Sequence, residues 1–147
     1  MKVLPISRIL LVDSQKERRE SLRLELLKFG LGDVLEAETL DAVSGPALPE
    51  NTNLLVVQAD DPDLIFQNPY RDGGGIPAIL IVDLPQRELE RVSVQGGYEA
   101  ALGMPLSPRI LYRRIGSVLQ QARRTSRAMT PLQISSVTSD ATGLPSV

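Results

Sequence analysis

Short apolar runs recur along the chain and predict β-strands. The clearest are residues 9–12, 53–57 and 78–82, which are rich in leucine, isoleucine and valine and are too short for helices. Near-continuous apolar runs of this length are typical of strands that are buried on both faces, as in parallel sheets. Two weaker segments, 34–37 and 100–103, complete a set of five expected strands.

The segment after the first strand has the pattern of an amphipathic helix. Ser14 and Glu17 are spaced as a capping box, in which each side chain satisfies a free backbone N–H at the start of the helix. Leu22 and Leu26 lie on one apolar face, and Gly30 is expected to end the helix. The charged residues that we expect in water are Glu17, Arg19, Glu20, Arg23 and Lys28.

Two later helices are also predicted. Pro85 suits the first turn of a helix with Leu89 and Val92 on its apolar side. Ser107 and Pro108 form an N-cap followed by a first-turn proline, and they mark the start of a long final helix. The apolar positions of this final helix follow the spacing i, i+4, i+7, i+8, i+11 and are Leu111, Ile115, Val118, Leu119 and Ala122.

The remaining connections leave little room for helices. Residues 39–44 can form at most about one turn before glycine and proline intervene, and residues 64–70 can form only a short helix. Strands that alternate with helices are typical of an α/β fold with a doubly wound parallel sheet. We therefore expect one domain over residues 1–127, with shortened second and third helices. Residues 128–147 are rich in serine and threonine and show no period, so we expect a disordered tail.

Composition limits the chemistry that this domain can perform. The 147 residues include no cysteine and no histidine, which excludes disulfides, thiol catalysis and the commonest general base and metal ligand. The formal net charge of −2 indicates no overall affinity for nucleic acid. No apolar run is long enough to span a membrane. We expect a cytoplasmic protein that is not an enzyme.

The residues around the first strand resemble a known family. A buried strand that ends at Asp13 and passes directly into an amphipathic helix is similar to the opening of the receiver domains of two-component response regulators. The resemblance extends from about residue 7 to residue 124. It implies a flavodoxin-like, CheY-like sheet of five strands in the order 2-1-3-4-5, whereas the sequence by itself predicts only the alternation of strands and helices.

The phosphorylation site that this resemblance implies is degenerate. Receiver chemistry uses Mg²⁺ held by carboxylates, an aspartate that accepts a phosphoryl group, a hydroxyl that follows this group and a lysine that neutralises it. At the matching positions the chain keeps Asp13 but has Ser14 in place of the second acid. Gln58 replaces the acceptor, Val82 the hydroxyl residue and Met104 the lysine. Because a carboxamide cannot form an acyl phosphate, we expect no phosphotransfer, no metal and no cofactor at this site.

Two interpretations of the acidic residues stay open. Asp13 is either a structural group at the end of a strand or a metal ligand. Asp60 or Asp61 could complete a weak cation site with Asp13. These acids, together with Asp63, could equally form a solvated turn.

The final helix carries the strongest surface signal. Residues 107–127 include six arginines and no acid, which is compatible with a solvated basic face or with binding of carboxylates or phosphates. The resemblance implies that the helix after Pro85, the fifth strand and the final helix form the face that binds partners. We expect this face to pair acids with arginines reciprocally in a homodimer, with Tyr112 as an aromatic anchor. The charged residues concerned are Glu88, Glu90, Arg109, Arg113 and Arg114.

Two classes of function fit these observations. The first is a phosphorelay-type signalling module, a pseudo-receiver, that is independent of phosphorylation and acts by contact with another protein or with itself. The second is a nucleic-acid-associated regulator that uses the arginine-rich last helix on phosphates. A small enzyme or a metal-dependent phosphatase is poorly supported, because the chain lacks histidine and cysteine.

Overall fold

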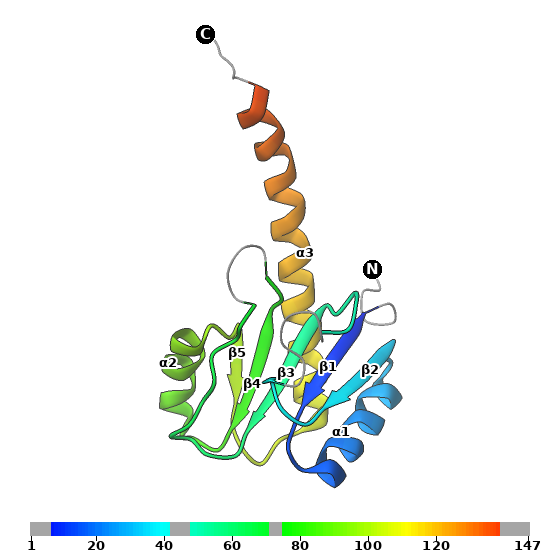
Figure 1. Cartoon of the computed structure of the whole chain (residues 1–147), viewed down its shortest axis with the longest axis vertical. Helices are drawn as coiled ribbons and strands as arrows, with labels where there is room; N and C mark the ends of the chain where they lie inside the picture. Colours follow the sequence, from blue (N-terminus) through cyan, green and yellow to red (C-terminus); the bar gives the residue numbers. More distant parts are fainter. Residues whose placement is uncertain (1–6, 42–47, 71–74, 139–147) are drawn as a thin grey trace.

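A five-stranded parallel sheet forms the centre of the fold (Figure 1). The computed structural model of the chain describes residues 7–41, 48–70 and 75–138, with side chains up to residue 124. The strands are β1 (Arg8–Val12), β2 (Asp33–Ala37), β3 (Leu54–Ala59), β4 (Ala78–Val82) and β5 (Ala100–Leu102). Their order is β2-β1-β3-β4-β5, and every neighbouring pair is parallel. The five predicted strands and the implied doubly wound order are confirmed.

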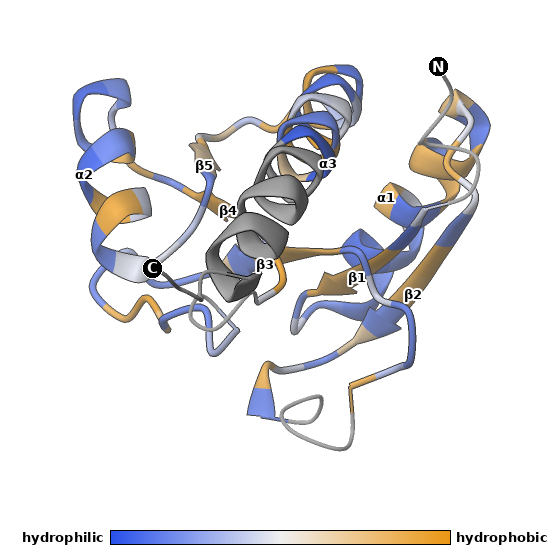
Figure 2. Cartoon of the chain, turned by 90° about the horizontal axis from the view of Figure 1, so that it is seen from above, coloured by the Kyte–Doolittle hydropathy of each residue, from blue (hydrophilic) through white to orange (hydrophobic). Residues whose placement is uncertain are grey.

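Helices cover both faces of this sheet. Those in the described residues are α1 (Lys16–Phe29), α2 (Gln86–Gly96) and α3 (Pro108–Thr138). α1 and α3 pack together on one face, and α2 covers part of the other (Figure 2). Ile9 and Leu11 pack in the first layer, whereas Leu10 and Val12 pack in the second, because successive side chains of a strand point to opposite faces. None of the described helices has both the length and the hydropathy that a membrane span requires.

The start of α1 differs from the prediction, and its end agrees with it. α1 begins after the N-cap residue Gln15, whose side chain makes no capping hydrogen bond. The Ser14 hydroxyl instead donates to Asp60 Oδ2 at 2.7 Å, so the predicted capping box with Glu17 is wrong. A carboxylate that arrives from β3 is a stronger partner than a local backbone group. Gly30 ends the helix in the left-handed region, at a φ of 117°.

α2 and the start of α3 lie close to their predicted positions. Pro85 occupies the N-cap of α2 rather than its first turn, and Leu89 and Val92 are buried as predicted. The backbone N–H of Ile110 donates to Ser107 Oγ at 3.4 Å, which confirms the predicted N-cap of α3. The buried apolar positions of α3 are Leu111, Ile115, Val118 and Leu119.

The later turns of α3 leave the body of the protein. Ala122 is exposed, contrary to the prediction. The later part of α3 extends past the end of the sheet (Figure 1). The backbone remains helical to Thr138, so the prediction of a structureless tail is wrong for residues 128–138. Extending an existing helix by one residue costs much less free energy than nucleating a new helix. A search for hydrophobic periodicity does not take this difference into account. Residues 139–147 lie outside the described residues.

Residues 60–70 contain no helix, although the sequence predicted a short one there. Long-range hydrogen bonds hold this segment against the end of α2. The Asn68 N–H donates to the Gly96 carbonyl at 2.8 Å, and the Tyr98 hydroxyl donates to the Phe66 carbonyl at 2.6 Å. Burial raises the pKa of Tyr98 to about 12. The predicted helix is wrong because distant partners satisfy backbone groups that a helix would satisfy locally.

The other predicted short helix lies mostly outside the described residues. Residues 39–41 contain no α-helix, and residues 42–44 are not among those described. Most of the glycine loop at residues 73–75 is also outside them.

Removal of residues 129–147 is expected to change the melting temperature little. Residues 121–124 are all exposed, so α3 has left the core before residue 125. Circular dichroism during heating measures the effect. Leu119→Ala is the control, because Leu119 is buried and its truncation should cost roughly 2–5 kcal/mol. A drop of more than about 4 °C in the shortened chain, equivalent to about 1 kcal/mol, would show that the removed residues pack on the domain.

Candidate functional site

The candidate site lies at the carboxyl ends of β1 and β3, the edge at which doubly wound sheets bind ligands. Asp13 directly follows β1 and is only 1% exposed. Val12 pairs with Val57 across the two strands, so Gln58 lies next to Asp13. Two distant parts of the chain therefore meet at this edge of the sheet.

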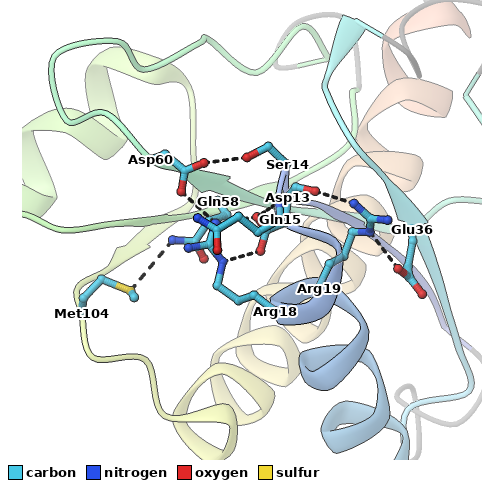
Figure 3. A network of polar contacts seen from close by, with 9 residues as sticks. All are labelled: Asp13, Ser14, Gln15, Arg18, Arg19, Glu36, Gln58, Asp60 and Met104. Carbon is cyan, nitrogen blue, oxygen red and sulfur yellow. Dashed lines mark hydrogen bonds and ion pairs between the residues drawn. The ribbon is translucent and has the colours of Figure 1, made fainter.

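A bidentate ion pair neutralises Asp13 (Figure 3). Arg18 Nε lies 2.7 Å from Asp13 Oδ2, and Arg18 Nη2 lies 2.5 Å from Asp13 Oδ1. The backbone N–H of Gln15 also donates to Asp13 Oδ1, at 3.0 Å. A buried carboxylate is costly unless it is paired and hydrogen bonded, and the planar guanidinium group matches both of its oxygens. Arg18 thus compensates the buried charge of Asp13.

Arg18 also binds a second carboxylate. Its Nη2 atom donates to Asp60 Oδ1 at 2.8 Å, and the Ser14 hydroxyl donates to Asp60 Oδ2 at 2.7 Å (Figure 3). The hydrogen bond from Ser14, followed by the one from Arg18, holds the pKa of Asp60 below its ordinary value. The pKa of Arg18 is raised, mainly because Arg18 donates hydrogen bonds to Asp13. Arg18 and Asp60 therefore stay ionised at neutral pH, and Arg18 bridges two acids.

A second arginine joins the same strand end to β2. Arg19 Nη1 donates to the backbone carbonyl of Asp13 at 2.7 Å, and Arg19 Nε donates to Glu36 Oε1, also at 2.7 Å. Arg23 Nε lies 2.7 Å from the other oxygen of Glu36. The prediction that Arg19 and Arg23 are solvated is therefore wrong. Glu36 lies on β2, so the spacing of residues within α1 could not predict these contacts.

The residues at the degenerate positions make weak or apolar contacts. Gln58 Nε2 lies 3.9 Å from Met104 Sδ, which is a weak acceptor (Figure 3). Val82 is fully buried at the end of β4. No carboxylate stands at the position of Gln58, and no cation stands at that of Met104. The edge that would carry receiver chemistry therefore has an internal ion bridge on one side and neutral groups on the other.

The site does not fit a magnesium ion. Mg²⁺ requires several hard oxygen ligands in an octahedral array. Both oxygens of Asp13 and both oxygens of Asp60 accept hydrogen bonds from Arg18, Gln15 and Ser14. Asp61 turns away, because its Oδ1 accepts the Asp63 N–H at 2.9 Å in an exposed turn. In the described part of the chain, no group of three or more acids is placed to hold a metal ion.

Arg18 is the central residue of the site, and the sequence interpretation missed it. Asp13, Ser14, Gln58 and Met104 lie on this edge of the sheet, whereas Asp60 was considered as a metal ligand or as part of a solvated turn. One signal was available. Basic residues in the first turn of a helix oppose the helix dipole, so Arg18 in that turn required a compensating acid nearby.

Three of the six residues predicted for the partner face make contacts elsewhere in the chain. The Arg109 guanidinium lies 5.4 Å from the centroid of the Phe29 ring, and the Tyr112 ring stacks on Phe29 at 5.3 Å. Both side chains therefore face α1 rather than α2, and the expectation that Tyr112 anchors the face with α2 is wrong. Glu88 pairs with Arg91 on its own helix at 2.6 Å. The exposed charges that remain on the predicted face are Glu90, Arg113 and Arg114.

Comparison with known proteins identifies the fold. No protein-family model matches the chain, and no curated protein matches it. A CheY-like receiver domain protein from Methanospirillum hungatei JF-1 superposes with a TM-score of 0.61 at 22% identity, over 81% of this chain and 98% of that one. An orphan response regulator of H. pylori gives 0.63 at 19% identity, over 79% and 98%. A two-component response regulator from Clostridium difficile gives 0.61 at 17%, over 78% and 96%.

These matches cover nearly the whole length of the compared structures, and their TM-scores of 0.61 to 0.63 show a common fold. They agree with the strand order. The chain therefore has the fold of the CheY-like response regulator receiver domains, as the residues around Asp13 predicted.

Proposed function

We propose that this chain is a signal-transduction module that acts by contact with other proteins and whose state is independent of phosphorylation. The observation that carries this proposal is the bridge from Arg18 to Asp13 and Asp60. In receiver domains that the chain resembles, a metal ion lies among the acids at this edge of the sheet. Here an arginine of the chain supplies the positive charge, and it is always present.

The chemistry of arginine makes this arrangement permanent. A guanidinium group does not lose its proton in proteins, so Arg18 keeps its positive charge at every physiological pH. Two carboxylates that approach the same atom, Arg18 Nη2, would repel each other without it. The site is thus held in a single electrostatic state by the chain itself.

The neutral side of the site supports the same conclusion. Phosphoryl transfer requires a carboxylate that can form an acyl phosphate and cations that match its developing charge. Gln58 and Met104 supply neither, and their side chains contact each other across the gap between β3 and the loop after β5. Regulation of this domain therefore acts through contacts at its surface or through the amount of the protein that is present.

The surface that we assign to partner binding is the face formed by α2, β5 and α3. β5 is an edge strand with one unpaired side, and Glu90, Arg113 and Arg114 are exposed on the flanking helices. Acids on one helix and arginines on the other allow either a second copy or another protein to pair with this face. Exposed pairs contribute roughly 0.2–1 kcal/mol each, so such a contact is weak and sensitive to salt.

Incubation with acetyl phosphate and Mg²⁺ is expected to leave the mass of the protein unchanged. Gln58 offers no carboxylate to accept a phosphoryl group, and the carboxylates of Asp13 and Asp60 are engaged by Arg18. Intact-mass spectrometry measures the result. A magnesium-dependent gain of one phosphoryl group on Asp13, Asp60 or Asp61 would show that the acceptor has moved to another acid.

Arg18→Ala is expected to lower the free energy of unfolding and to create a response to magnesium. The loss should be roughly 1–3 kcal/mol, less than for a fully buried pair because 30% of the Arg18 side chain is exposed. About 10 mM Mg²⁺ should raise the melting temperature of the variant, whose two acids are freed, and not that of the unmodified chain.

Arg87→Ala is the matched control for this experiment, because Arg87 is exposed on α2 and should change stability by less than about 0.5 kcal/mol. A clear magnesium-dependent stabilisation of the unmodified chain would contradict the role of Arg18 as the internal cation.

Reversal of charge with Arg113→Glu and Arg114→Glu together is expected to weaken association at low salt. Sedimentation velocity at about 50 and 300 mM salt measures it, since exposed pairs are screened at the higher concentration. Lys16→Glu with Lys28→Glu is the control, because these exposed lysines on α1 give the same change in net charge. Equal association of the two variants would remove this face from the proposal.

A further inference from the structure

A groove lies between residues 62–67 and α2. Its volume is about 430 Å³. Ile65 and Val92 line it, together with the acids Asp63 and Glu88. No residue of the ion bridge lines it, and none of the exposed charges that we assign to the face formed by α2, β5 and α3 does so. The groove is therefore a separate surface of the domain.

Hydrogen bonds fix the wall of the groove that residues 62–67 form. The Asn68 N–H donates to the Gly96 carbonyl at 2.8 Å, and the Tyr98 hydroxyl donates to the Phe66 carbonyl at 2.6 Å. The Asn68 side chain is buried, and its amide nitrogen donates to the Ile76 carbonyl at 2.9 Å. A wall that is already ordered loses little conformational freedom when a partner binds, which favours association.

Two large apolar side chains on this wall are exposed. Leu64 and Phe66 are each 59% exposed, whereas Ile65 between them packs against the core. This alternation is that of an extended chain with one side in the core and the other in solvent. Exposed apolar side chains of this size on one side of an ordered segment indicate a contact surface.

The charge around the groove is negative. The described lining residues and their immediate neighbours in the chain include five acids and two arginines, which gives a net charge of −3. Among the described residues no cation pairs with Asp63, whereas Glu88 pairs with Arg91 at 2.6 Å. The groove therefore keeps unbalanced negative charge, and Asp63 is open to a partner. The acids are Asp61, Asp63, Asp83, Glu88 and Glu90, and the arginines are Arg87 and Arg91.

The groove follows α2, and the fold places no helix on its other side. Glu88, Val92 and Gln95 line it at the spacing i, i+4, i+7, which is one stripe along α2. Parallel strands are usually joined through a helix, yet the described residues between β3 and β4 contain none. Two helices pack together when a row of side chains on one lies in a groove beside a row on the other. The occupant that suits this geometry is a helix.

The charge and the exposed apolar side chains define the chemistry of this helix. An occupant with complementary properties combines positive charge with apolar side chains. We infer that the groove binds a basic amphipathic helix of a partner protein. A lysine or arginine of this helix lies beside Asp63, and its apolar side chains cover Leu64 and Phe66. This contact adds a second surface to the proposed function and does not depend on the face formed by α2, β5 and α3.

Fluorescence anisotropy with a labelled synthetic peptide tests this contact on the full-length chain. The probe is a helical peptide of about 14 residues with leucine on one face and lysine on the other. A dissociation constant of roughly 10–100 μM is expected. In two comparison peptides, serine replaces leucine or glutamate replaces lysine, and each is expected to bind at least about tenfold more weakly. Equal binding of either comparison peptide, or no binding of the leucine–lysine peptide up to about 1 mM, overturns the inference.

Substitution of the exposed apolar side chains locates the contact. Leu64→Ser with Phe66→Ser is expected to raise the dissociation constant of the leucine–lysine peptide about tenfold. Leu24→Ser with Val94→Ser is the control and should leave it unchanged, because these side chains are 53% and 71% exposed and do not line the groove. Circular dichroism checks that both variants keep the fold. Equal constants for the two variants overturn the inference.

Substitution of two acids tests the role of charge. Asp63→Asn with Asp83→Asn is expected to raise the dissociation constant about threefold at about 50 mM salt and to reduce its dependence on salt. Glu17→Gln with Glu20→Gln gives the same change in net charge at exposed positions of α1 and should have less effect. A control that weakens binding as much as the groove variant overturns the inference. The leucine–lysine peptide has no acid that pairs with arginines, so its failure to bind leaves the α2, β5 and α3 face intact.

Discussion

The bridge from Arg18 to Asp13 and Asp60 is the interaction on which this site depends. Asp13 lies almost fully buried at the end of a central strand, where an unpaired carboxylate would cost several kcal/mol. Arg18 supplies the matching charge from the first turn of the helix that follows. The same guanidinium group holds Asp60, which Ser14 also binds, so one side chain joins the end of β1, the start of α1 and the loop after β3.

Under the proposed function, this bridge also explains why a receiver fold can persist without receiver chemistry. Acids gathered at the carboxyl ends of strands need a counter-charge, whether or not they perform a reaction. A bound metal supplies it reversibly, whereas an arginine supplies it permanently. Once Arg18 is in place, the neutral Gln58 and Met104 add no further charge nearby. In the proposed function the fold then serves as a rigid support for surfaces that bind proteins.

The two faces of the sheet differ in how completely they are covered. α1 and α3 cover one face with a continuous apolar layer. The other face is covered by α2 and by extended segments. Residues 60–70 are one of these segments, and hydrogen bonds from Asn68 and Tyr98 hold them in a non-helical conformation. Leu64 and Phe66 of this segment stay exposed beside α2.

The sequence by itself determined the strands, the positions of α1, α2 and the start of α3, and Asp13 as a site residue. Apolar runs, helical spacing and stop signals such as Gly30 are local, and burial against a sheet has few alternatives. Only the tertiary structure decided that Ser14 binds Asp60 instead of capping α1, that Arg18 bridges two acids, and that Tyr112 packs on α1. Each of these outcomes depends on a partner far away in the chain, whose stronger contact overrides the local preference.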